Sequence, residues 1–191
     1  MELDFIVDKV FEKIDFSKTP IQRAEYENCS FLNCNFLEVD LSELIFADCE
    51  FIDCNLSLAK LTKTAFREVH FKNCKLLGLL FDTCDVFGLS FSFENSSLNH
   101  ASFYNTKIKK TVFRNSQLQE VDFTGCDLSA ARFEDTDLKG ATFYNTLLEK
   151  SDFRSAYNYS LDPETCNVKK AKFSLAAIAG LLSKYDIEIS V

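Results

Sequence analysis

The chain has 191 residues, of which 47% are apolar, and it carries a formal net charge of -8. This length and apolar content suit one folded domain, and five glycines and two prolines are too few for a disordered or collagen-like chain. The acidic balance argues against a nucleic-acid ligand and permits a basic protein partner. No apolar run reaches the length of a membrane-spanning helix, so no membrane partner is expected.

The first residues combine acids with apolar side chains and lack the basic start of a secretory signal. We therefore expect a cytoplasmic protein. A regular pattern begins only at Phe16, and we expect the apolar segment from Phe5 to Phe11 to cover one end of the fold.

From Phe16 onward, a large apolar residue recurs at every fifth position as far as Phe91. A seven-residue step leads to Leu98, and the five-residue spacing then continues to Phe153. The first residue of each block from Ala101 to Ser155 is small or β-branched. A period of five fits neither the α-helix nor the simple alternation of a strand, so a solenoid is predicted.

Blocks such as TDLKG, CDLSA and CNFLE resemble those of the pentapeptide-repeat family over roughly residues 14–156. The resemblance implies an all-β fold, a right-handed quadrilateral β-helix. One block would form each side, and the first and third residues would point inward. With 16 blocks before the break and 12 after it, four blocks per coil give about seven coils.

The spacing of the phenylalanines tests the four-sided geometry independently of the resemblance. Residues 20 apart should stack, and we expect a break within 93–97 to form a corner bulge that leaves one continuous helix. The column then contains Phe31, Phe51, Phe71, Phe91, Phe113, Phe133 and Phe153, and a second column contains Phe81, Phe103, Phe123 and Phe143.

The last residue of many blocks is Asn, Asp or Gly, the types that best tolerate the positive φ that tight turns require. We expect these residues to form the corners of the coil: Asn28, Asn33, Asp48, Asp53, Asn73, Gly78, Gly88, Asn105, Asn115, Gly125, Asp135, Gly140 and Asn145.

Seven of the eight cysteines occupy the first place of a block, where a small inward residue is required. They are Cys29, Cys34, Cys49, Cys54, Cys74, Cys84 and Cys126. Free, buried thiols are the favoured interpretation, although stacking would bring Cys34, Cys54 and Cys74 within disulfide range. A metal site is disfavoured because no CxxC motif and no nearby histidine accompany these cysteines. Cys166 lies outside the repeats and has no explanation from the pattern.

Signs of catalysis are absent from the sequence. The only histidines are His70, at an outward position, and His100, near the break, and no phosphate-binding loop occurs. We expect a protein that is not an enzyme and that has no catalytic residues, cofactor or metal.

Charge is distributed unevenly along the chain. Between Ala24 and Ala59 there are eight acids and no Lys or Arg; we call these eight the acidic band: Glu25, Glu27, Glu38, Asp40, Glu43, Asp48, Glu50 and Asp53. A basic stretch follows from Lys60 to Lys75, and a cluster of three lysines lies at 107–110. The band is either the solvated face of a soluble rod or a surface offered to a basic groove in a protein partner.

The repeat ends after Phe153, so we divide the chain into a β-helix with an N-terminal cap (1–156) and a C-terminal crossover, helix and short strand (157–191). An α-helix is predicted from Ser174, its N-cap, with an apolar stripe at Leu175, Ile178, Leu181, Leu182 and Tyr185. The alternating residues 187–191 predict a short strand.

This C-terminal segment is similar to the ends of the Qnr/MfpA-type quinolone-resistance proteins. The resemblance implies a head-to-head homodimer through the helix, with the apolar stripe as its interface. It also implies a rod that mimics DNA and binds a type II topoisomerase, DNA gyrase or topoisomerase IV, without binding nucleic acid itself. The alternative is a structural or adaptor solenoid with another protein partner.

Overall fold

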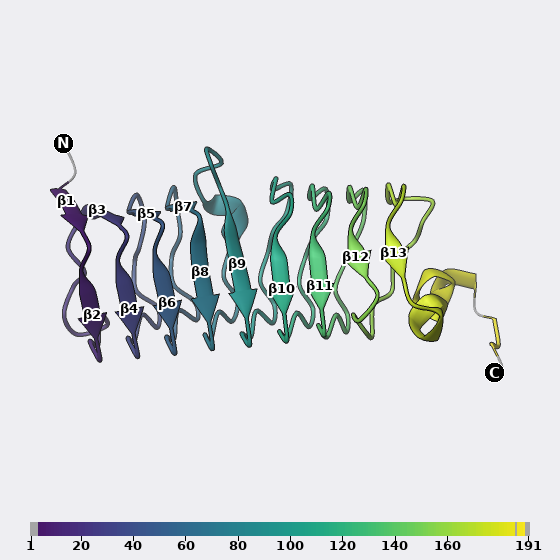
Figure 1. Cartoon of the computed structure of the whole chain (residues 1–191), viewed down its shortest axis with the longest axis horizontal. Coiled ribbons are helices and arrows are strands. Elements are labelled where there is room, and N and C mark those ends of the chain that lie inside the picture. Colours follow the sequence, from purple (N-terminus) through teal and green to yellow (C-terminus); the bar gives the residue numbers. More distant parts are fainter. Residues whose placement is uncertain (1–3, 186, 190–191) are drawn as a thin grey trace.

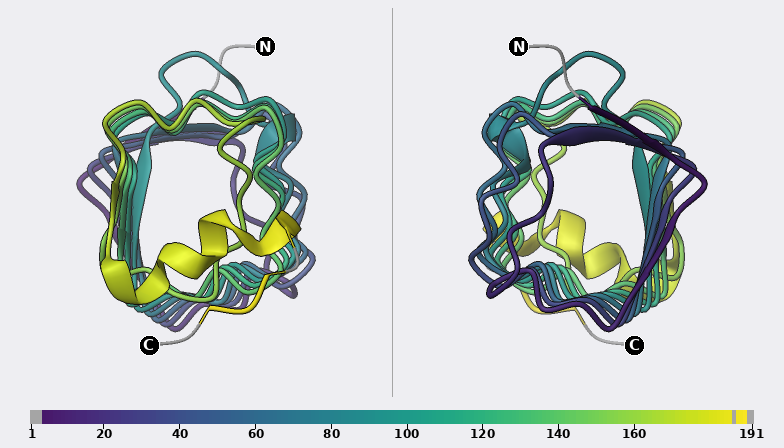
Figure 2. Two further views of the ribbon diagram at one scale, coloured as in Figure 1. Left: turned by 90° about the vertical axis from the view of Figure 1, so that its right-hand side faces the viewer. Right: turned by 90° about the vertical axis from the view of Figure 1, so that its left-hand side faces the viewer.

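The computed structural model describes residues 4–185 and 187–189, and it shows a right-handed β-helix of about eight coils (Figure 1). Seen along its axis, the β-helix has a square outline (Figure 2). Two of its sides carry the strands, and we call them sides A and B. The two sides that follow along each coil are sides C and D.

Side A is a parallel sheet in the order β1-β3-β5-β7. Its strands are β1 (Asp4–Val7), β3 (Ala24–Glu27), β5 (Ile45–Ala47) and β7 (Ala65–Arg67). Side B is a nine-stranded parallel sheet that runs in chain order. Its strands are β2 (Val10–Glu12), β4 (Ser30–Leu32), β6 (Glu50–Ile52), β8 (Val69–Lys72), β9 (Phe91–Glu94), β10 (Val112–Arg114), β11 (Arg132–Glu134), β12 (Asp152–Phe153) and β13 (Lys172–Phe173).

Neighbouring coils pair in the predicted register. Residues 20 apart face each other across the sheets, as Phe31 faces Phe51. Isolated parallel bridges hold sides C and D at the same spacing, for example between Asn35 and Asn55. The prediction of four blocks per coil is therefore confirmed.

The core is built from the third and first residues of the blocks, because both point inward. Rings of the main Phe column stack face to face with centroids 4.4 to 5.3 Å apart. Small polar residues in first places are buried too, and their hydroxyls donate to backbone carbonyls across coils. Thr64 does so to the carbonyl of Leu41 at 2.8 Å. The Thr64 hydroxyl is thus satisfied, as burial requires.

All thirteen predicted corner residues have positive φ. The same conformation occurs at corner residues of other types, including Leu58, Lys110, Ala130 and Lys150. A coil therefore turns at this position whatever residue occupies it, and Asn, Asp and Gly only lower the cost of the turn.

The prediction that Phe91 belongs to the main Phe column is wrong. Side B pairs Phe71 with Phe93 and Val69 with Phe91, so Phe93 occupies the column. Its ring lies 5.3 Å from those of both Phe71 and Phe113. The column is Phe11, Phe31, Phe51, Phe71, Phe93, Phe113, Phe133, Phe153 and Phe173.

The two residues that exceed the five-residue period lie before β9 and not within 93–97, where the sequence predicted them. Residues 85–90, which we call the insertion loop, follow the 3-10 helix η1 (Phe81–Thr83) and project from the square outline (Figure 2). Val86 and Phe87 point to solvent, whereas Leu89 of the same loop is buried in the core. The Phe91 ring is buried beside them, 5.1 Å from the rings of both Phe81 and Phe93. A first place that normally takes a small residue thus accepts a phenylalanine.

The N-terminal segment is the first coil rather than a separate cap. Strand β1 pairs with β3, and β2 pairs with β4. Ile6 and Phe11 pack against the core, and the Phe11 ring stacks on that of Phe31 at 4.9 Å. This coil, and the continuation of side B to Phe173, extend the β-helix beyond the seven predicted coils.

The predicted C-terminal α-helix is instead a pair of 3-10 helices, η2 (Leu175–Leu181) and η3 (Ser183–Tyr185). They lie across the end of the β-helix (Figure 2). Ser174 precedes η2 as predicted, but its side chain makes no capping hydrogen bond. Residues 187–189 form no strand, and the rest of the predicted strand, 190–191, lies outside the described residues. None of the described helices is long and apolar enough to cross a membrane.

Several contacts fasten these helices to the last coil. Ala177 and Leu181 pack against the core, and the N–H of Leu161 donates to the carbonyl of Gly180 at 3.0 Å. The Lys184 ammonium lies 2.8 Å from Asp162 and 2.6 Å from Glu164. The hydrogen bonds that Lys184 donates to the two carboxylates raise the pKa of Lys184 and lower the pKa of Asp162 and of Glu164. The pair η2–η3 therefore covers the apolar edge that the last coil would otherwise expose.

Candidate protein-binding surfaces

The acidic band surrounds the rod rather than forming one face. Glu25 and Glu27 lie on β3 of side A, and Glu50 lies on β6 of side B. Asp40 is on side D, where it pairs with Lys60. The remaining four are corner residues with positive φ: Glu38, Glu43, Asp48 and Asp53.

Three acids of the band are paired with bases of other coils. Glu43 pairs with Arg23, and the Asp40 carboxylate lies 3.2 Å from the ammonium of Lys60. Glu25 lies 4.0 Å from Arg67. Within the described part of the chain, the other five form no ion pair: Glu27, Glu38, Asp48, Glu50 and Asp53. The negative potential of the band therefore rests on these five.

The predicted apolar stripe of the terminal helix is divided between the core and solvent. Ile178, Leu181 and Leu182 are half-buried, because η2 lies on the last coil. Leu175 is 89% exposed and Tyr185 is 51% exposed. Ile187 and Ile189, beyond the helices, are exposed as well. An apolar outer surface thus remains at this end, although the predicted residues do not all contribute to it.

The cysteines are all free and buried. The predicted column is present, since the N–H of Cys34 lies 3.3 Å from the Sγ of Cys54. Cys166, which the pattern left unexplained, is buried and its Sγ donates to the carbonyl of Phe143. Burial raises the pKa of Cys49 and of Cys126 to about 12. The thiols are therefore packing groups and not nucleophiles.

We expect a thiol reagent such as DTNB to label the native protein only slowly at pH 8. The reagent must reach the sulfur to react, and all eight thiols are buried. Stopped-flow absorbance in buffer and in urea measures the difference, and the unfolded chain supplies the full count of eight. Rapid labelling of the native protein would contradict the assignment.

The histidines offer no sign of catalysis. The Nδ1 of His70 lies 2.6 Å from the Oγ of Ser92, and that of His100 lies 3.1 Å from Glu120. Both histidines are exposed. The residues that the structure describes contain no cluster of three or more His, Cys, Asp or Glu that could hold a metal ion.

Sequence reasoning missed the insertion loop as a surface feature. Val86 is 81% exposed and Phe87 is 75% exposed. A hollow lies beside this loop and is lined in part by Val69, Phe91 and Lys110. The signal was available, because two apolar residues precede Gly88 at the point where the period is lost.

Comparison with known proteins agrees with this architecture. A family model described as a pentapeptide repeat region matches residues 21–92 and 79–153. A trypsin-treated form of QnrB1, a plasmid-mediated fluoroquinolone resistance protein, has a similar structure with a TM-score of 0.58 and 19% sequence identity. That match covers 98% of this chain and 92% of QnrB1.

HetL, a pentapeptide repeat protein involved in heterocyst differentiation regulation from the cyanobacterium Nostoc sp. strain PCC 7120, is similar with the same TM-score of 0.58. Its identity is 13%, over 92% of this chain and 88% of HetL. No curated protein sequence gives a significant match. At these identities the structural likeness shows a shared fold.

Proposed function

Because the chain belongs to the pentapeptide-repeat family, we propose that it is a non-enzymatic, protein-binding rod whose acidic band enters the DNA-binding groove of a type II topoisomerase such as DNA gyrase. The observation that carries this proposal is the ring of unpaired acids around the early coils. The fold shared with QnrB1, a fluoroquinolone resistance protein, supports the choice of partner.

The charge density of the band is comparable with that of DNA. Residues 24–59 rise roughly 9 Å at about 4.8 Å per coil. Their five unpaired acids therefore give about one negative charge per 2 Å, against about one per 1.7 Å of duplex DNA. A groove lined by Lys and Arg would meet a similar potential over this length.

We propose that the outer surface of the terminal helices joins two rods end to end. Leu175 and Tyr185 are its most exposed members among the stripe residues, and pairing of two copies would bury them. About eight coils at about 4.8 Å each would give a paired rod of roughly 75 Å. Leu175→Glu should abolish this contact without loosening the cap, because Leu175 does not pack against the core.

A gyrase supercoiling assay tests the topoisomerase proposal. The protein is titrated into purified gyrase with relaxed plasmid, with and without a fluoroquinolone, and we expect it to change supercoiling or relieve the drug's inhibition. The double variant Glu38→Lys and Asp53→Lys should lose this effect, because it removes two unpaired acids from the band.

The matched control is Glu120→Lys with Asp135→Lys, which makes the same charge change at the same two corners further along the rod. All four sites have positive φ, and lysine is tolerated at such corners, as at Lys63. The control should act like the wild type. If both double variants lose the effect on gyrase equally, net charge alone explains the effect, and the role of the band is refuted.

A structural or adaptor solenoid is the second candidate. It is favoured by the basic corner residues Lys110, Lys150 and Lys170 in the second half of the rod, which interrupt a DNA-like potential. If this candidate is right, purified gyrase should be unaffected at any concentration of the protein.

A further inference from the structure

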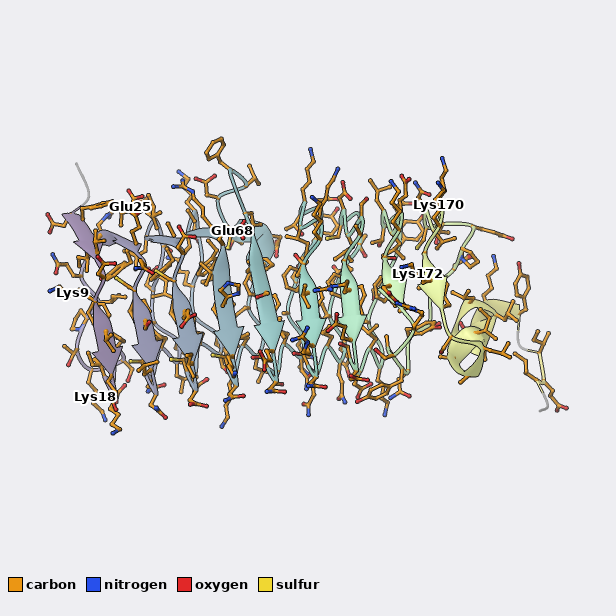
Figure 3. All side chains as sticks on the ribbon, in the orientation of Figure 1. Lys9, Lys18, Glu25, Glu68, Lys170 and Lys172 are labelled. Carbon is orange, nitrogen blue, oxygen red and sulfur yellow. The ribbon has the colours of Figure 1, made fainter. Side chains whose placement is uncertain are left out.

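The corner between sides A and B, which we call the A/B edge, changes sign halfway along the rod. Strand registers place one residue per coil in a line on this edge. Figure 3 shows Glu68 and Lys170 on the same upper margin of the molecule, in its two halves. From the N-terminal end the line reads Asp8, Asn28, Asp48, Glu68, Ser90, Lys110, Ala130, Lys150 and Lys170. Its first half is acidic, and its second half is basic.

The adjacent line on side B repeats this reversal in part. Glu50 lies before its midpoint at Ser92, and Arg132, whose guanidinium lies 3.3 Å from Glu134, lies after it, each two coils away. Asp152, one coil beyond Arg132, is an acid in the otherwise basic half of this line. Among the described residues, Glu50, Glu68 and Lys110 form no ion pair. The cations nearest the midpoint are already engaged: Lys109 lies 3.1 Å from Asp127, and Arg67 lies against Phe87 and Glu25.

The insertion loop lies at the point of reversal. It ends at Ser90, the midpoint of the edge, and it carries the exposed Val86 and Phe87. The N–H of Phe87 donates to the Asp85 carboxylate at 2.9 Å, and the Arg67 guanidinium lies 5.8 Å from the Phe87 ring centre. These contacts hold an apolar projection outward, beside the hollow lined in part by Val69 and Phe91.

We propose that the A/B edge is an interface for a second copy of this chain, laid antiparallel along the first with the two-fold axis at the coil of Ser90. This arrangement reverses the order of the coils and brings acids of one copy opposite bases of the other at three places, while Asp48 faces Ala130 and Lys150 faces Asn28. Glu68 faces Lys110 of the second copy, Glu50 faces Arg132, and Asp8 faces Lys170. The match is possible because every coil adds the same rise, about 4.8 Å.

The insertion loops of both copies meet near the axis. Val86 and Phe87 then supply an apolar centre, and each Phe87 lies opposite the hollow of the other copy. The charged pairs form a rim on either side. This is the usual anatomy of a specific interface, with apolar anchors at the centre and polar groups around them. A two-fold contact also uses the same surface twice, as symmetric dimers do.

A second copy fits this edge better than a polyanion does. Nucleic acid or an anionic lipid surface would meet the basic half but would be repelled by the acidic half of the same edge. The net charge of -8 adds to that repulsion. Only a partner with the same reversal of sign satisfies both halves, and this chain is such a partner.

The inference does not depend on the proposed topoisomerase partner or on contact through the terminal helices. It does affect binding to the proposed topoisomerase, because Asp48 and Glu50 of the acidic band would lie within the interface. The side-by-side dimer would therefore compete with any basic protein that binds the band.

A charge-swap experiment tests the interface by sedimentation equilibrium at low salt. The double variants Glu50→Lys with Glu68→Lys, and Lys110→Glu with Arg132→Glu, should each dimerise at least about tenfold more weakly than the wild type. An equimolar mixture of the two should form a heterodimer of near wild-type affinity, because each reversed half then faces its complement. A wild type that is monomeric at high concentration, or a mixture that fails to associate, would overturn the proposal.

Two single variants locate the contact. Phe87→Ser should weaken dimerisation by about tenfold while leaving the fold unchanged, since the side chain is in solvent. Leu175→Glu should leave this dimer intact. Unchanged affinity in Phe87→Ser, or loss of all association in Leu175→Glu, would place the contact elsewhere and contradict the assignment.

Discussion

Replacing Phe113 with Ala is expected to destabilise the protein by about 3–5 kcal/mol, the largest effect of any conservative truncation we consider. The ring is fully buried and lies between those of Phe93 and Phe133, with centroids 5.3 and 5.1 Å away. It also meets Phe103 and Phe123 edge to face. Removing it leaves a cavity that the stacked coils on either side cannot close, because the backbone register fixes their spacing.

Urea unfolding followed by circular dichroism measures this loss. The matched control is Phe87→Ala, which removes the same atoms from an exposed ring and should change stability by less than about 0.5 kcal/mol. If the two variants lose similar stability, the Phe column is not the principal source of the fold's stability.

Gly180→Val is expected to detach the terminal helices from the end of the β-helix. A Cβ at this position would lie 2.2 Å from the backbone carbonyl oxygen of Tyr159, which cannot move without breaking the last coil. Loss of the packing of Ala177 and Leu181 should lower stability by about 2–4 kcal/mol. The bare coil edge should then promote aggregation.

Ala179→Val is the control, because Ala179 lies in the same helix and is exposed. Light scattering and urea unfolding on the two variants separate the contact at Tyr159 from a general effect of valine on the helix. A Gly180→Val protein that is as stable and soluble as Ala179→Val would show that the helices do not act as a cap.

Much of the fold could be predicted from the sequence, because each coil repeats the same demands. An inward ring is needed every fifth residue, and a corner must adopt positive φ. Phe31, Phe51 and Phe71 satisfy the first demand, and Asn33 and Asp53 satisfy the second. Two further signals were present but unused. Ile6 and Phe11 precede Phe16 at the same spacing, and Phe173 follows Phe153 by 20.

The insertion could not be placed by counting alone. Phe91 and Phe93 are both large and apolar, so either could continue the column after Phe71. The pairing of β8 with β9 places Phe93, and not Phe91, opposite Phe71 in the column. The loop then falls at residues 85–90, where Gly88 adopts a φ of +70° without strain. The cost of burying Phe91 at a position that normally takes a small residue is offset by its contacts with the rings of Phe81 and Phe93.

The candidate surfaces were only partly predictable, because charge counts along the chain do not show which charges meet. Glu43 is neutralised by Arg23 of the preceding coil, and Asp40 by Lys60 of the next. Both pairs are 20 residues apart and could have been found once the coil length was known. The apolar stripe was misjudged for a different reason. Its residues lie on two sides of the 3-10 helix η2, and Leu181 packs against the core.

Displacement of DNA tests the central functional claim most directly. A short fluorescent duplex is bound to purified gyrase, and its anisotropy is followed as the unlabelled protein is added. We predict that the wild type and the Glu120→Lys, Asp135→Lys control release the duplex, increasingly so at low salt, because the competing contacts are ionic. The Glu38→Lys, Asp53→Lys variant should release little. If a large excess of the wild type leaves the duplex bound, or if the two double variants release it equally, the acidic band does not act as a mimic of DNA.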